Sequence, residues 1–158
     1  MRVRQYVYLG LRSDDLDPGA MSERVGLVPD EVKLRGERIP GPPPMPRCHQ
    51  WKVRSGLPDT TELDEQFAAL LVKVDGAAPA IRALLAGGEA SGCIYVVRTF
   101  EPGPEDRAIS EVGRKGPGWE RLGGQHPLVG FHLDAALLQF AVESGLELDF
   151  DEYGDEDE

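Results

Sequence analysis

The chain has 158 residues, of which 41% are hydrophobic, with two cysteines and a formal net charge of −11 at pH 7. This size predicts a single domain whose core needs neither disulfides nor a structural metal. The acidity argues against nucleic-acid binding, because phosphates repel a negative surface. No apolar run is long enough to cross a bilayer, so we expect no membrane association.

The negative charge is concentrated at the end of the chain. Residues 1–58 carry ten Lys/Arg and seven Asp/Glu, whereas residues 128–158 carry ten Asp/Glu and neither Lys nor Arg. Near the start, the apolar stretch 7–11 is too short for a secretory signal and charges follow it at once. We therefore expect a cytoplasmic protein.

The first elements follow from hydrophobic alternation and helix-capping residues. Residues 3–12 predict a strand with two apolar faces, which is typical of the centre of a sheet. A short helix over 18–25 is predicted to begin after Asp17 as N-cap and to end at Gly26. A brief edge strand over 31–35 follows.

The middle of the chain predicts two further strands and a pair of helices. A proline-rich loop over 36–47 precedes a strand over 48–55. Apolar residues at helical spacing then predict two helices that are divided at Gly76. The strand over 91–100 is apolar on both faces in its middle, so it too is expected near the centre of the sheet.

The last third of the chain begins with an irregular stretch. Residues 101–127 hold six glycines and four prolines and predict a long loop. A strand over 130–133, a helix capped by Asp134 and a strand over 146–151 are predicted to follow, with an acidic disordered tail at 154–158.

Taken together, these elements predict one α+β domain over residues 1–153. We expect a single mixed or mainly antiparallel β-sheet of about five or six strands, with helices packed on one face.

A family resemblance rests on an ordered set of short segments: 6–9 (Tyr-Val-Tyr-Leu), 13–18 (Ser-Asp-Asp-Leu-Asp-Pro), Trp51 with 55–57 (Ser-Gly-Leu), 130–133 (Gly-Phe-His-Leu) and 145–153 (Gly-Leu-Glu-Leu-Asp-Phe-Asp-Glu-Tyr). Over about residues 5–153 the chain resembles a bacterial family catalogued as domain of unknown function 4279. The resemblance implies a small cytoplasmic bacterial domain with no established activity. In size and general style, such domains resemble the immunity proteins of bacterial toxin systems.

No motif in the sequence carries recognisable catalytic chemistry. Cys48 and His49 are adjacent on a predicted strand and would point to opposite faces, so they would not pair as nucleophile and base. The few soft ligands lack the paired spacing of a zinc site. We expect no catalytic residue, no metal and no cofactor, and a protein that is not an enzyme.

An acidic ladder is the leading candidate for a binding surface. Glu147, Asp149 and Asp151 alternate along the last predicted strand and share one face. Together with Trp119 in the long loop, they would recognise a basic protein, because exposed Trp is a common interface anchor. The same carboxylates could instead face water or pair with cations on neighbouring strands, for which the candidates are Arg2, Arg4, Arg12, Lys52 and Arg54.

Two further hypotheses stay open at this stage. A small-molecule-binding protein or enzyme would use an aromatic-lined pocket beside the long loop, formed by Tyr6, Tyr8, Trp51 and Tyr95. A structural domain without a ligand is the other. The sequence predicts neither the oligomeric state nor the order of the strands.

Overall fold

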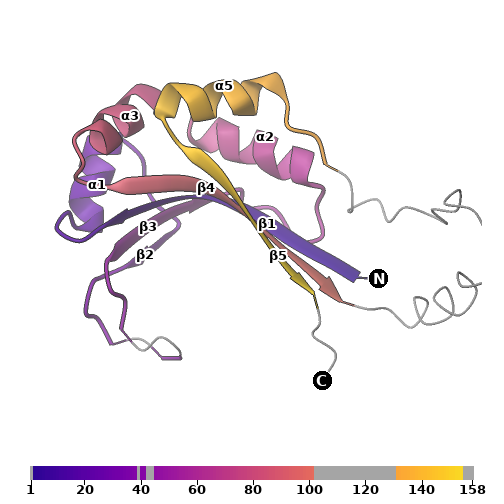
Figure 1. The fold of residues 1–158 in the computed structure, drawn as a ribbon, viewed down its shortest axis with the longest axis horizontal. Coiled ribbons are helices and arrows are strands. Elements are labelled where there is room, and N and C mark those ends of the chain that lie inside the picture. The colour runs from indigo at the N-terminus through magenta and orange to yellow at the C-terminus, as the bar shows by residue number, and fades with distance from the viewer. Residues whose placement is uncertain (1, 39, 42–44, 102–130, 155–158) are drawn as a thin grey trace, which may run out of the picture.

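Two layers, a sheet and a set of helices, make up the part of the chain that the computed structural model describes: residues 2–38, 40–41, 45–101 and 131–154. The strands are β1 (Arg2–Ser13), β2 (Glu31–Lys33), β3 (His49–Arg54), β4 (Ser91–Glu101) and β5 (Glu147–Gly154). The helices are α1 (Pro18–Val25), α2 (Leu63–Lys73), α3 (Ala78–Ala86) and α5 (Ala135–Ser144). All four helices lie on one side of the sheet (Figure 1), which confirms the predicted α+β class.

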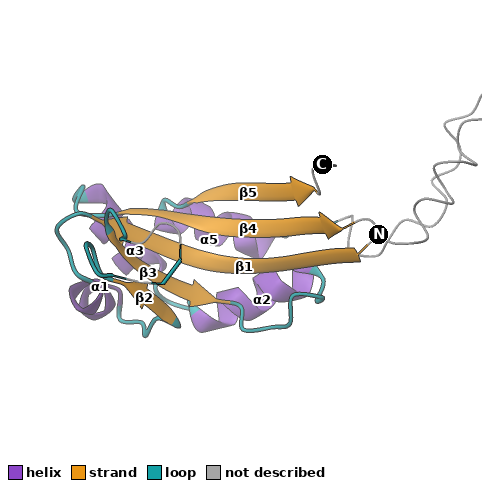
Figure 2. Cartoon of the chain, turned by 90° about the horizontal axis from the view of Figure 1, so that it is seen from below, coloured by secondary structure: helices purple, strands orange, loops and turns teal. Residues whose placement is uncertain are grey.

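The five strands form one mixed sheet in the order β2-β3-β1-β4-β5. The central strand β1 is antiparallel to both β3 and β4. The edge strand β5 runs parallel to β4, and the other edge strand, β2, is antiparallel to β3. Figure 2 looks onto the face of the sheet that the helices leave uncovered.

The alternation of β1 decides which side chains enter the core. Val7, Leu9 and Leu11 point toward the helices and are fully buried. They pack in one apolar cluster with side chains of β3, β4 and the four helices. Burying each such side chain contributes about 1.5–3 kcal/mol, so this row supplies much of the stability of the sheet.

Helix caps form where the sequence predicts them for α1 and α5. The carboxylate of Asp17 accepts hydrogen bonds from two backbone N–H groups in the first turn of α1, and Asp134 accepts one from Leu137. Gly26 and Gly145 end these helices in the left-handed conformation, with φ of 75° and 73°. Both predictions of the helix bounds are confirmed.

The strand predicted over 130–133 is wrong. Residues 131–134 have no regular structure, and residue 130 lies outside the described residues. Here the backbone N–H of His132 donates to the carboxylate of Asp64 at the start of α2, and Leu133 packs against the core. This segment therefore joins the helical layer and not the sheet. The loop predicted over 101–127 and the tail predicted over 154–158 each begin one residue too early, because Glu101 ends β4 and Gly154 ends β5. Their other residues, 102–127 and 155–158, lie outside the described part.

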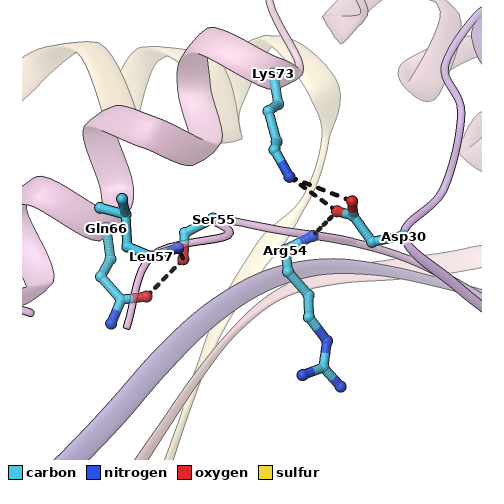
Figure 3. A network of polar contacts seen from close by, with 6 residues as sticks. All are labelled: Asp30, Arg54, Ser55, Leu57, Gln66 and Lys73. Carbon is cyan, nitrogen blue, oxygen red and sulfur yellow. Dashed lines mark hydrogen bonds and ion pairs between the residues drawn. The ribbon is translucent and has the colours of Figure 1, made fainter. Parts of the chain in front are cut away.

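A buried amide continues the pairing of β1 beyond the end of β3. The backbone of Val7 accepts from the N–H of Ser55, while its own N–H donates to the Oε1 atom of Gln66 at 3.3 Å. Gln66 is fully buried; its Oε1 also accepts from the Ser55 hydroxyl (Figure 3) and its Nε2 donates to the carbonyl of Gln5 at 2.7 Å. One side chain of α2 thus satisfies the backbone of the central strand.

Replacing Gln66 with leucine should destabilise the fold strongly. The change leaves the N–H of Val7 and the carbonyl of Gln5 buried without a partner, at a cost of about 2–4 kcal/mol in the free energy of unfolding. Urea unfolding followed by circular dichroism measures it. The matched control is Gln139→Leu on the exposed side of α5, for which we expect a loss below about 0.5 kcal/mol. Equal losses in the two variants would contradict the role of Gln66.

Candidate functional site

The face of the sheet away from the helices, which we call the open face, is divided by charge. Strand alternation and register place three groups of side chains on it. These are the cationic band (Lys33, Lys52, Arg54 and Arg12), the tyrosine row (Tyr6, Tyr8 and Tyr95) and the acidic ladder (Glu147, Asp149 and Asp151). The tyrosine row runs along the middle of the sheet, with the cationic band mostly on the β2–β3 side and the acidic ladder on β5.

The rings of the tyrosine row stack on one another. The ring centroids of Tyr6 and Tyr8 are 6.1 Å apart, and those of Tyr8 and Tyr95 are 4.8 Å apart with an interplanar angle of 16°. A Cβ atom at Gly10 would lie 2.9 Å from Cε2 of Tyr95, so the glycine makes room for this ring to lie across β1. The row is therefore a continuous aromatic surface.

Cations of the same chain cover these rings. The Nζ atom of Lys52 lies 4.8 Å from the centroid of the Tyr8 ring, and the guanidinium of Arg12 lies 5.2 Å from that of Tyr95. With these neighbours, Tyr8 keeps only 9% of its surface exposed. The centre of the open face is thus tiled by side chains in contact.

A single carboxylate, that of Glu31, serves three cations of the cationic band. Its oxygens lie 2.5 Å from the Arg54 guanidinium, 3.4 Å from the Lys52 ammonium and 3.7 Å from the Lys33 ammonium. Burial acts to raise the pKa of Glu31, but the hydrogen bond from Arg54 and the charge of Lys52 outweigh it and lower the pKa below its ordinary value. The band keeps an excess of positive charge.

The neighbouring carboxylate, that of Asp30, ties the loop before β2 to α2. It accepts a hydrogen bond of 2.7 Å from the backbone N–H of Arg54 and one of 3.1 Å from the Lys73 ammonium (Figure 3). Burial acts to raise the pKa of Asp30, and these two hydrogen bonds together with the Lys73 charge lower it overall. The cationic side of the sheet is therefore fixed to the helical layer.

The acidic ladder, in contrast, has no ion-pair partner within the described part of the chain. Its neighbours across the sheet are Cys93, Tyr95 and Val97 of β4, none of which is a cation. The alternative in which nearby cations neutralise the ladder is wrong for the described residues, because β4 separates β5 from their strands. These cations are Arg2, Arg4 and Arg12 on β1, and Lys52 and Arg54 on β3. The ion pair that β5 does form, between Arg98 and Glu152, involves a carboxylate outside the ladder.

The ladder also influences the one cysteine that lies beside it. Burial, followed by the charges of Asp149 and Glu147, raises the pKa of the Cys93 thiol to about 11. The thiol is therefore protonated near neutral pH and is a poor nucleophile. Cys93 behaves as the small buried side chain that the sequence predicts.

The structure brings together three of the four aromatic residues predicted to line a pocket. Tyr6, Tyr8 and Tyr95 meet on the open face, but Trp51 does not join them. It is fully buried on the helical side of β3, where its Nε1 donates to the hydroxyl of Ser22 in α1 at 2.9 Å. The prediction of a pocket that includes Trp51 is therefore wrong, because Trp51 points to the same face of β3 as Val53, whereas Lys52 points to the open face. Trp119 lies outside the described residues.

An open cleft that sequence reasoning missed lies at one end of the sheet. Its volume is about 700 Å³, and loops from three distant parts of the chain contribute to it around Ser13, Cys48 and Glu89. The hydroxyl of Ser13 is engaged, since it donates to the carbonyl of Glu89 and accepts from the N–H of Leu16. The Ser13 hydroxyl is therefore held by the backbone and is not an activated nucleophile, and no local sequence pattern marks the cleft.

The described residues contain neither a metal-binding cluster nor a membrane-spanning helix. None of their His, Cys, Asp and Glu side chains form a group of three or more that is placed to hold a metal ion. None of the described helices is long and apolar enough to cross a bilayer. The open face, where charges of both signs and stacked aromatic rings gather, is the candidate site in this part of the chain.

The stability of the protein should fall in alkaline solution partly through Tyr8. Burial, followed by the neighbouring Tyr95 and Tyr6, raises the pKa of Tyr8 from 10.0 to about 12. A raised pKa means that folding favours the protonated phenol, so this stabilisation is present below pH 10 and is lost as the pH rises toward 12. Tyr8→Phe should have a shallower alkaline loss of stability in urea unfolding. An unchanged slope would contradict the assignment, and comparison at about pH 8, where phenols are protonated, is the internal control.

Comparisons with known proteins assign a family but no activity. The family model described as "Domain of unknown function (DUF4279)" matches residues 3–110. Neither the curated proteins nor the solved structures contain a match to the chain. The matched residues cover β1 to β4, and with them the cationic band and the tyrosine row. This chain belongs to the DUF4279 family of domains of unknown function.

Proposed function

We propose that this protein is a non-catalytic binding module that recognises a basic protein through the acidic ladder. The observation that carries the proposal is the state of Glu147, Asp149 and Asp151 in the described structure. They line one face of an edge strand and have no ion-pair partner among the described residues, whereas Glu31 at the other edge is surrounded by cations.

The physical argument is electrostatic. Unpaired carboxylates at spacings of about 7 Å along a strand produce a negative potential that attracts a basic surface and steers its approach. Each new pair with Lys or Arg then adds a modest gain, and several in a row add specificity of orientation. The exposed Tyr6 and the partly exposed Tyr95 provide aromatic contact area for the same partner.

The proposal extends to biological setting by analogy with small immunity proteins. We place the protein in the bacterial cytoplasm, where it would cover a basic surface of a toxin without altering it chemically. The absence of an activated nucleophile at Cys93 and Ser13 supports a role that is not enzymatic. Trp119 stays part of the proposed contact, as an anchor in the loop.

The alternative of an aromatic-lined small-molecule pocket has less support. Small-molecule sites are concave, whereas Tyr6, Tyr8 and Tyr95 stack in a row beneath cations of the same chain. The open cleft lies at the end of the sheet, around Ser13 and Glu89, and is not lined by the tyrosines.

Removing the charge of the ladder should remove partner binding. The variant E147Q/D149N/D151N keeps the shape of the strand and loses three negative charges. We expect basic proteins that the wild type retains from an extract at low salt to bind the variant at least about tenfold more weakly. Affinity capture followed by titration calorimetry with the purified partner measures the effect.

The matched control neutralises three exposed acids elsewhere. The variant E23Q/E65Q/D75N has the same net charge as the ladder variant, and its altered side chains lie on or beside helices α1 and α2. It should bind the partner like the wild type. If both variants bound the partner equally weakly, the effect would come from net charge and not from the acidic ladder. If the wild type recovered no basic protein, the proposal would be overturned.

A further inference from the structure

The register of the strands gives the open face a self-complementary pattern. Consider a line between β1 and β4, parallel to the strands. The two strands next to this line are β1 and β4, and the next strands outward are β3 on one side and β5 on the other. On the open face, β3 carries cations and β5 carries carboxylates. Two rows across the sheet hold the complete pattern: Lys52, Gly10, Cys93, Glu147; and Arg54, Tyr8, Tyr95, Asp149.

We propose that the open face docks onto the open face of a second copy of this chain, forming a symmetric dimer. A two-fold axis along the line between β1 and β4 exchanges β3 with β5 and β1 with β4. It brings Lys52 opposite Glu147 of the second copy, and Arg54 opposite Asp149 of the second copy. Tyr8 then lies opposite Tyr95 of the second copy, beneath the cations that cover both rings. Each contact occurs twice, as a two-fold interface requires.

Other orientations are disfavoured by charge. A two-fold axis perpendicular to the strands, but still in the interface plane, would place β3 opposite β3 and β5 opposite β5. Lys52 and Arg54 would then face cations, and the acidic ladder would face carboxylates, which costs several kcal/mol. Only the axis along the strands matches opposite charges row by row.

Face-to-face packing of sheets suits this arrangement geometrically. Two sheets pack at a distance of about 10 Å with strand directions within about 30° of each other, which an axis along the strands allows. The tyrosine row and the cations that lie across it form the kind of filled surface that such packing needs. At that separation, long Lys and Arg side chains reach a carboxylate on the facing sheet.

The size of the interface predicts a weak dimer. From β3 to β5 the face spans three strand spacings of about 4.8 Å, and β1 contributes a length of about 36 Å, so the planar footprint is about 500–550 Å² per copy. A standard interface buries about 800 Å² per partner. The charge pairs must therefore carry much of the association, which makes it sensitive to salt.

The charge balance within one copy supports the same pairing. On the β2–β3 side, Lys33, Lys52 and Arg54 share the single carboxylate of Glu31. On the β5 side, the acidic ladder has no ion-pair partner among the described residues. One edge thus has an excess of two positive charges, and the other has three carboxylates without such a partner. This inference does not rest on the proposed basic partner, although both use the acidic ladder.

Charge reversal tests the dimer with purified protein. In K52E/R54E the cationic side becomes negative, and in E147K/D149K the acidic side becomes positive. Analytical ultracentrifugation at about 100 μM chain and about 50 mM salt should find the wild type at up to twice its monomer mass of 17.3 kDa, and as a monomer at about 500 mM salt. Each variant alone should self-associate at least about tenfold more weakly.

Mixing the two variants is the decisive measurement. In the mixture, every acidic residue of one variant faces a basic residue of the other, so a 1:1 heterodimer should form at low salt. Two controls, R38E/R47E and E23K/E65K, make the same changes in net charge at exposed positions outside the strands, and should dimerise as the wild type does. Circular dichroism verifies that each variant folds. If K52E/R54E does not fold, the loss of self-association in E147K/D149K tests the proposal by itself.

Three results would overturn the proposal: a monomeric wild type at low salt, an E147K/D149K variant that still dimerises, or a mixture of the variants without heterodimer. The basic-partner proposal is separable from this one. K52E/R54E keeps the acidic ladder, so it should lose the dimer and still bind a basic protein. Loss of partner binding by E147Q/D149N/D151N has no bearing on the mixing result.

Discussion

The position of β1 at the centre of the sheet, paired on both sides, is the constraint on which the rest of the structure depends. Because successive side chains of a strand point to opposite faces, a slip of one residue would exchange its apolar and tyrosine rows. The burial of Val7, Leu9 and Leu11 makes such a slip very costly. Gln66 holds the same register from the helical side, since it bonds the backbone of Val7 and of Gln5. The composition of the open face follows from this one register.

The parallel pairing of β4 with β5 explains why the acidic ladder meets no cation among the described residues. A parallel pair requires a crossover connection, and here α5 forms part of it on the helical side. The crossover leaves β5 at the edge, next to a strand whose open-face side chains are uncharged at Cys93, Tyr95 and Val97. An edge strand rich in carboxylates also resists pairing with other sheets. The acidic ladder thus protects the edge strand β5 from pairing with another sheet, and its carboxylates face outward.

The sequence predicts local features of this fold better than relations between elements. Helix caps at Asp17 and Asp134 depend on neighbouring residues, so they are correct. The order of the strands depends on distant contacts, so the separation of β5 from the cations of β3 could not be foreseen. The burial of Trp51 could have been foreseen, because Trp51 and Val53 are two residues apart on a half-buried strand and so point to the same, core-facing side. The error arose because Trp51 was grouped with the tyrosines by aromatic character and not by the face of its strand. The strand predicted over 130–133 failed because His132 and Leu133 find partners in the helical layer.

The two proposed occupants of the open face exclude each other, because both pair with Glu147 and Asp149. A second copy therefore competes with a basic partner, and the apparent affinity for that partner falls as the concentration of the protein rises. The two sides of the open face differ in what they lose when the dimer separates. When a dimer separates, Lys52 and Arg54 keep the carboxylate of Glu31, whereas the ladder returns to water without a cation from the described part of its own chain. The weak dimer would thus cover the ladder until a partner with a larger or more basic surface displaces the second copy.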